Sequence, residues 1–276
     1  MGGTVRDAYG RVLRAGAALA AGAALVAGCS SGGGGGDAKP PRETPGKSTP
    51  GTPTPTPTPT SKPTAPVFTP DPKKAPRTEA EARRLALAIV AGPDDWGPDY
   101  VKRTPFLSET GYWPVLDENC EWEAGTLPRS ILYSVTAYSE IPAAGGKGPL
   151  RVAATVTVHR TPTDADWEMA ETLEEPLRCP DQELRQGERI TGLQSLGMPY
   201  GADENTDSLI ERGSYLNDAF KGPQLYSWYQ LRIGQVSVAA VVKGAPGHTE
   251  TETNLSQVRA SATMQDRAKK QLGAQS

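Results

Sequence analysis

The alternation of apolar and polar residues predicts several β-strands between residues 131 and 242. Large apolar side chains occupy every second position in these segments, which is the period of a strand with one buried face. Glycine-rich residues 143–148 predict a flexible loop between the first two strands, and Gly234 marks the turn of the last hairpin. The predicted strands cover residues 131–138, 150–160, 189–196, 208–215, 225–232 and 236–242.

Helical spacing of apolar residues predicts three helices around these strands. Thr78 and Glu81 have the spacing of a capping box, so a first helix is expected to begin at this point. Thr163 is predicted to cap a second helix, which Pro176 is expected to end. Residues 250–273 predict a terminal helix with a polar face.

Hairpins with helices before and after them indicate the α+β class, with an antiparallel sheet and flanking helices. Residues 78–276 are long enough to form one domain with its own core. Within this domain, residues 92–125 contain Pro, Gly and Asp throughout and predict a long loop.

Residues 29–77 lack the apolar periodicity of a folded segment. Five consecutive glycines, Gly32 to Gly36, precede a Thr-Pro repeat over residues 52–60. Such a stretch buries too little apolar surface to offset the entropy of ordering it, and its prolines favour extended polyproline II. We therefore expect residues 29–77 to be a disordered linker.

Residues 1–28 have the pattern of a secretory signal peptide. Three arginines precede an uncharged run rich in Ala, Leu, Val and Gly, which ends in Leu25 to Gly28 directly before Cys29. This arrangement resembles the bacterial lipobox, in which the cysteine is acylated and becomes the mature N-terminus. The sequence therefore predicts lipid attachment at Cys29 and an anchor on the extracytoplasmic face of the cell membrane; the alternative is a free terminal cysteine.

Acylation of Cys29 leaves an even number of cysteines, Cys120 and Cys179. In an oxidising compartment we expect these two residues to form a disulfide, the alternative being two separate buried thiols.

Charge and motifs exclude several functions. The net charge is −3, and loss of three arginines and one aspartate with residues 1–28 makes it about −5, so no nucleic-acid partner is expected. The sequence contains no phosphate-binding loop, dinucleotide fingerprint, nucleophile elbow or zinc-protease motif, and we expect no cofactor.

Two histidines and two acidic groups remain as candidates for catalysis or metal binding; one of these groups, Asp203, Glu204 and Asp207, is expected to be a simple loop. His159 shares a strand face with threonines and is expected to be solvent-exposed, and His248 lies in a predicted loop. The acidic residues Asp94, Asp95 and Asp99 surround a tryptophan, and their prolines and glycine favour a turn over a calcium site. We therefore expect no catalytic residue and no metal.

The strand expected over residues 225–232 carries the best candidate binding residues. Tyr226, Trp228 and Arg232 share one face with Gln230. Stacking surface beside a charged donor suits a small-molecule or peptide ligand, although the same residues would also suit a core beneath a helix.

Four parts of the domain together resemble the extracytoplasmic sensor domain of PknH-type serine/threonine kinases and related actinobacterial lipoproteins. They are the Ala/Leu-rich first helix, a cysteine after a Trp/Tyr/Pro-rich segment, residues 161–167 entering a helix that leads to Cys179, and residues 226–236 before the last helix. The resemblance implies an α+β domain with a cleft for an extracellular ligand. This chain departs from that family by having one cysteine pair instead of two disulfides and no kinase half.

The sequence thus predicts a lipid-anchored envelope protein with a ligand-binding or sensor-like domain and no enzymatic activity. The alternatives are a hydrolase or transferase that acts on the envelope, and a structural lipoprotein that binds proteins. A histidine placed beside a serine in a pocket would favour the hydrolase.

Overall fold

The structure is a computed structural model that describes residues 68–199 and 205–273. These residues belong to the second of two compact units, Ser61–Ser276. The elements are α1 (Glu79–Ile89), α2 (Pro93–Trp96), β1 (Val101–Leu107), β2 (Tyr112–Leu116), β3 (Trp122–Thr126), β4 (Ile131–Ile141), β5 (Leu150–His159), α3 (Pro162–Arg178), β6 (Gln182–Arg185), β7 (Glu188–Pro199), β8 (Thr206–Asn217), β9 (Gln224–Ile233), β10 (Val236–Lys243) and α4 (Glu250–Leu272).

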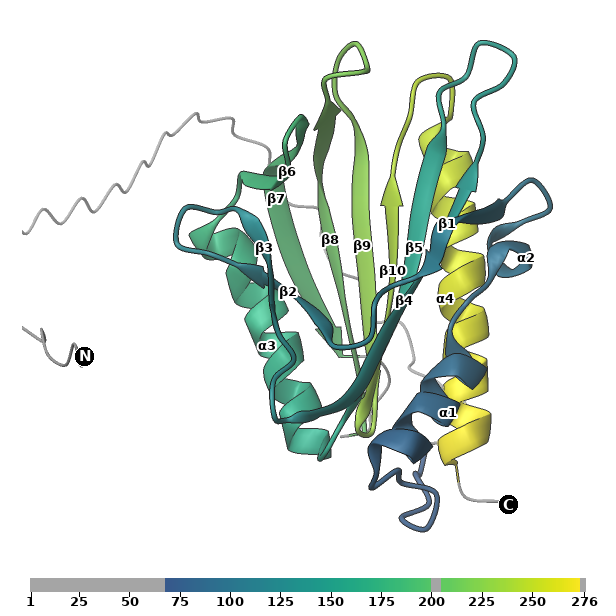
Figure 1. Cartoon of the computed structure of the whole chain (residues 1–276), viewed down its shortest axis with the longest axis vertical. Coiled ribbons are helices and arrows are strands. Elements are labelled where there is room, and N and C mark those ends of the chain that lie inside the picture. Colours follow the sequence, from purple (N-terminus) through teal and green to yellow (C-terminus); the bar gives the residue numbers. More distant parts are fainter. Residues whose placement is uncertain (1–67, 200–204, 274–276) are drawn as a thin grey trace, which may run out of the picture. The chain divides into compact units, whose positions relative to one another are not determined.

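Eight strands form one curled sheet in the order β1-β4-β5-β10-β9-β8-β7-β6, and β2 and β3 form a separate two-stranded sheet (Figure 1). Neighbouring strands pair antiparallel throughout. The predicted α+β class, with an antiparallel sheet and flanking helices, is confirmed.

The main core lies between one face of the sheet and the helices α1, α2 and α4. Helix α4 packs on β9 and β10, and α1 packs on β4 and β5. Every second residue of the central strands points into this core, as the alternation predicts. Its fully buried members include Ala86, Ile89, Trp96, Val156, Val158, Ile233, Val236, Ala240 and Met264.

The opposite face of the sheet is covered by α3, which contacts β5, β7, β8, β9 and β10. Figure 1 shows α3 and α4 on opposite sides of the sheet, with the β2–β3 hairpin beside α3. The sheet therefore has one face packed in a continuous core and one face under a helix and a hairpin.

Helix α3 differs from its prediction at both ends. Thr161, not Thr163, is the N-cap, and its hydroxyl accepts a hydrogen bond from the backbone N–H of Asp164 at 3.1 Å. Pro176 lies inside the helix, which continues to Arg178. The expectation that Pro176 ends the helix is wrong.

Residues 92–125 are not one loop, because they contain α2 and the strands β1, β2 and β3. These strands have irregular burial, and half-buried and exposed residues follow one another without a period of two. The sequence consequently carries no alternation that could have revealed them.

The domain begins before residue 78. The backbone N–H of Asp71 donates to the carbonyl of Leu272 at 2.7 Å, and Gln235 donates to the carbonyl of Pro76 at 3.0 Å. Phe68 packs on the main core. The expected linker thus ends earlier than predicted; its remaining part and the expected signal peptide, including Cys29, lie outside the described residues. Among the described helices, none is both long enough and apolar enough to cross a membrane.

Cys120 and Cys179 form a disulfide, with their Cα atoms 5.5 Å apart. Cys120 lies in the turn between β2 and β3, and Cys179 is the C-cap of α3. The bond therefore fastens the hairpin to the end of the helix.

Candidate functional site

A cleft of about 490 Å³ opens between α3, the β2–β3 hairpin and the face of the large sheet beneath them. This volume is in the range of sites for drug-sized molecules. The residues that line the cleft include Tyr112, Trp113, Trp122, Ala153, Glu168, Glu171, Glu174, Glu175, Arg178, Glu211, Tyr226, Trp228, Ser237 and Lys243.

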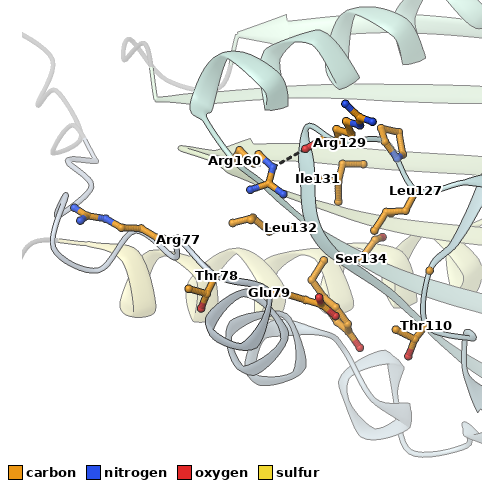
Figure 2. Close-up of a pocket in the computed structure, with 13 residues that line it drawn as sticks. Arg77, Thr78, Glu79, Thr110, Leu127, Arg129, Ile131, Leu132, Ser134 and Arg160 are labelled. Carbon is orange, nitrogen blue, oxygen red and sulfur yellow. Dashed lines mark hydrogen bonds between the residues drawn. The ribbon is translucent and has the colours of Figure 1, made fainter.

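A second pocket, of about 350 Å³, lies where the start of α1 meets the start of β4 (Figure 2). Its arginines Arg77, Arg129 and Arg160 are exposed, and Arg160 donates to the carbonyl of Arg129 at 2.5 Å. Among the described residues, no buried polar atom without a partner lines this pocket. The cleft is therefore the better candidate site.

Helix α3 contributes an acidic face to the cleft. Glu168, Glu171 and Glu175 follow at helical spacing, so they lie on one side of the helix. Burial raises the pKa of Glu175 to about 7; the nearby charge of Arg178 opposes this shift, and the other glutamates of the helix reinforce it.

Glu211 on β8 adds a more deeply buried carboxylate. Glu211 is 4% exposed, and its Oε1 atom has no hydrogen-bond partner among the described residues. Burial, and then the charge of Glu175, raises the pKa of Glu211 to about 8, and a side-chain hydrogen bond from Ser195 opposes this shift. A carboxyl group in this position is costly to ionise unless a cation or donor enters the cleft.

Aromatic side chains line the cleft beside these acids. Trp228 and Tyr226 come from β9, and Trp113 and Trp122 come from the hairpin. The indole N–H of Trp122 donates to Gln182 Oε1 at 2.8 Å, which fixes the ring against β6. The cleft thus presents flat apolar surfaces and carboxylates to the same space.

The structure places two of the three expected binding residues in the cleft, Tyr226 and Trp228. Arg232 is not part of its lining. It is 3% exposed and forms ion pairs with Asp166 Oδ1 at 2.6 Å and with Asp207 Oδ2, 2.7 Å from its Nε atom. Arg232 therefore ties β9 to α3 and β8, and a role as the charged donor of the cleft does not follow from its position.

Sequence reasoning did not identify Glu211. Glu211 lies directly across from Trp228 in the pairing of β8 with β9, so the two side chains share a face. This register depends on how β8 pairs with β9, and no short sequence motif predicts it. The available signal was a glutamate at the alternating position between Leu209 and Tyr215, on the face that those two residues bury.

His159 is buried, and the expectation of a solvent-exposed histidine is wrong. It is 1% exposed because α3 covers its strand face. Its Nε2 atom lies 2.8 Å from Glu168 Oε2 and 3.3 Å from Ser237 Oγ. Ser237 donates its hydroxyl to the same Glu168 oxygen.

This group does not have the geometry of a nucleophile relay. In such a relay, the acid and the serine contact opposite nitrogens of the imidazole. Here both contact Nε2 of His159, and Nδ1 has no partner among the described residues. The hydroxyl of Ser237 is moreover directed to Glu168.

The remaining sequence candidates have structural contacts. His248 Nε2 lies 3.0 Å from the carbonyl of Gly148, and Asp95 pairs with Arg267 at 2.9 Å. Asp95 also accepts the backbone N–H of Gly92 at the start of α2. The described residues contain no group of His, Cys, Asp and Glu side chains that could hold a metal ion.

Glu211→Gln is expected to stabilise the domain by about 4 kcal/mol near pH 8 and by about 1 kcal/mol near pH 5. The folded-state pKa of Glu211 is raised from 4.5 to about 8, so above pH 4.5 the unfolded chain releases its proton first. Stability is therefore lost as pH rises through this window, and the amide escapes this loss.

Urea titrations at several pH values measure this gain. The control is Glu174→Gln, an exposed residue of α3 that also lines the cleft. A gain for Glu211→Gln that did not grow with pH would show that Glu211 is not held neutral.

No family model and no curated protein matches the chain. Among solved structures, the chain is similar to an uncharacterized protein of Mycobacterium smegmatis, the Rv0999 ortholog. The identity is 10% and the TM-score is 0.29, and the match covers 64% of this chain and 99% of that chain. Likeness at this level carries no argument about function. The resemblance to the PknH-type sensor domain consequently rests on the sequence motifs alone.

Proposed function

We propose that the protein is a cell-envelope lipoprotein whose domain binds a small ligand in the cleft and does not catalyse a reaction. The observation that carries this proposal is the cleft of about 490 Å³, which is lined both by aromatic rings and by a buried carboxylate oxygen without a partner. Because this oxygen borders a cleft and is not enclosed in the core, a ligand can reach it and supply the donor.

A hydrolase is the second candidate, because His159 lies within 3.3 Å of Ser237 Oγ and the serine lines the cleft. The shared Nε2 contact and the hydrogen bond from Ser237 to Glu168 favour a structural polar network instead. This network joins β5, β10 and α3, so it holds the helix against the sheet.

The binding proposal is tested by filling the cleft. Ala153 lies in its lining, and Ala153→Trp places an indole in the space that a ligand would occupy. The matched control is Leu255→Trp, at a residue of α4 that is 50% exposed on the opposite side of the sheet.

Native mass spectrometry of the full-length protein, isolated in mild detergent from the membranes of its producing cells, should detect a bound small molecule. We expect the added mass in the wild type and in Leu255→Trp, and its loss from Ala153→Trp at an unchanged melting temperature. A wild-type protein without added mass, or an added mass that survives in Ala153→Trp, would contradict binding in the cleft.

The anchoring proposal rests on the lipobox pattern before Cys29. Cys29→Ala should prevent acylation and leave the protein in the exported soluble fraction or as an uncleaved precursor. Detergent-phase partitioning of processed Cys29→Ala protein would show that another feature holds the chain at the membrane.

A further inference from the structure

We propose that the cleft recognises a small molecule that carries a protonated amine, with the ammonium group between Glu211 and Trp228 and an apolar or aromatic body against the hairpin tryptophans. This inference rests on the proposed function, because it names the class of ligand that the same cleft takes.

Glu211 is buried beside the cleft without a charged partner. Its Oε1 atom is buried, and the donor beside its carboxyl group is the neutral hydroxyl of Ser195, directly across on β7. A buried carboxylate without a charged partner costs free energy, and a charged donor gives the largest recovery. An ammonium group supplies three N–H donors and a positive charge.

Acidic side chains outnumber basic ones in the lining of the cleft. Five glutamates line the cleft, with Arg178 and Lys243 as its cations; the glutamates are Glu168, Glu171, Glu174, Glu175 and Glu211.

Both cations have other partners. Arg178 donates to the carbonyl of Asp117 at 2.9 Å, and Lys243 donates to Glu188 at 3.2 Å. Burial keeps Glu211 and Glu175 partly or largely neutral, so the acidic excess of the lining comes mainly from its other three glutamates; this excess favours a cationic ligand and opposes an anionic one.

The indole of Trp228 lies where it can contact a cation that is bound by Glu211. Its indole lies across from Glu211 in the sheet register, so a ligand that reaches the carboxylate also passes the ring. A cation over a tryptophan face gains cation–π attraction, which increases when water is excluded. Trp113 and Trp122 on the hairpin offer apolar surface for the rest of the ligand.

The protonation of the cleft carboxyl groups predicts how the affinity for an ammonium ligand depends on pH. The charged and titratable groups that line the cleft with Glu211 come from five elements: Glu168, Glu171, Glu174, Glu175 and Arg178 on α3, Tyr112 on β2, Tyr138 on β4, Tyr226 on β9 and Lys243 on β10. Burial keeps Glu211 largely protonated and Glu175 about half protonated near neutral pH, so an ammonium ligand that pairs with Glu211 must displace a proton. Its affinity should rise with pH, whereas a neutral ligand that accepts a hydrogen bond from protonated Glu211 should bind more weakly as pH rises.

Isothermal titration calorimetry of the full-length protein in detergent measures the ligand affinities that test this inference. The probes are phenethylamine, 2-phenylethanol and phenylacetate, which share one body and differ in charge. We expect phenethylamine to bind at least about tenfold more tightly than the other two, and about tenfold more tightly at pH 8.5 than at pH 6. Glu211→Gln should lose about tenfold in phenethylamine affinity, and Glu174→Gln, at an exposed position, should lose less than about threefold.

Three results would overturn the inference: no phenethylamine binding at millimolar concentration, equal binding of the alcohol or the acid, or an unchanged affinity in Glu211→Gln protein that retains its melting temperature. A neutral or acidic molecule retained by the wild type and lost from Ala153→Trp would refute the ammonium ligand and leave the binding function intact. Absence of any retained molecule, together with probe binding unaffected by Ala153→Trp, would refute the cleft itself.

Discussion

Replacing Cys179 with serine is expected to lower the free energy of unfolding by about 4 kcal/mol, because the bond closes a long loop in the unfolded chain. The cysteines are 59 residues apart in sequence, and the bond joins the β2–β3 turn to the end of α3. Loss of this tether also frees the hairpin that carries Trp113 and Trp122 over the cleft. We therefore expect weaker ligand binding in addition to lower stability.

Urea unfolding of the wild type with and without a reductant is the companion measurement. Reduced wild type and Cys179→Ser should unfold at similar urea concentrations, and a wild type insensitive to reductant would contradict the prediction.

Cys120 has a left-handed backbone, with φ of 65°, which favours glycine. In the Cys179→Ser background, Cys120→Gly should consequently be more stable than Cys120→Ser by roughly 1 kcal/mol.

Trp96→Ala is expected to cost about 3–5 kcal/mol, because it empties the volume of a fully buried indole in the main core. Trp96 is 0% exposed and packs between α2 and the rest of the core, with its ring centroid 6.1 Å from that of Tyr100. The indole N–H has no partner among the described residues, so a purely apolar ring can replace it.

The matched control is Trp96→Phe, which should cost less than about 1.5 kcal/mol because it keeps most of the ring volume and removes the unpaired donor. Thermal melts of both variants measure the difference. Equal destabilisation by Ala and Phe would show that the indole N–H, and not its volume, stabilises the core.

Alternation predicted the central strands because their two faces have different surroundings. On β5, the valines Val152, Val156 and Val158 enter the core beneath α1, and the threonines Thr155 and Thr157 face the cleft. Because one face is packed and the other is polar, apolar residues occupy every second position of the strand, and this alternation can be detected in the sequence. The same contrast on β9 separated Tyr226 and Trp228 from the main-core residues Leu231 and Ile233, although Tyr226 is buried in a second, smaller cluster on its own face of the sheet.

The surroundings of the polar face could not be predicted from local sequence. His159 is buried because α3 crosses its strand face, and Glu211 meets Trp228 because of a strand register set by the whole sheet. Both depend on contacts between distant segments. The hairpin was missed because Pro114 and the mixed exposure of β2 hide the strand pattern.

The five tryptophans test the central claim, that the cleft is a ligand-binding site, in one experiment. Trp113, Trp122 and Trp228 line the cleft, Trp96 lies in the core on the other face of the sheet, and Trp167 is 65% exposed on α3. The measurement is the indole ¹H–¹⁵N NMR spectrum of the full-length protein, titrated with a small-molecule extract of its own envelope. We predict that the signals of the three cleft tryptophans shift together while those of Trp96 and Trp167 stay in place. An extract that shifts Trp167 alone, or leaves all five signals unchanged, would contradict the claim.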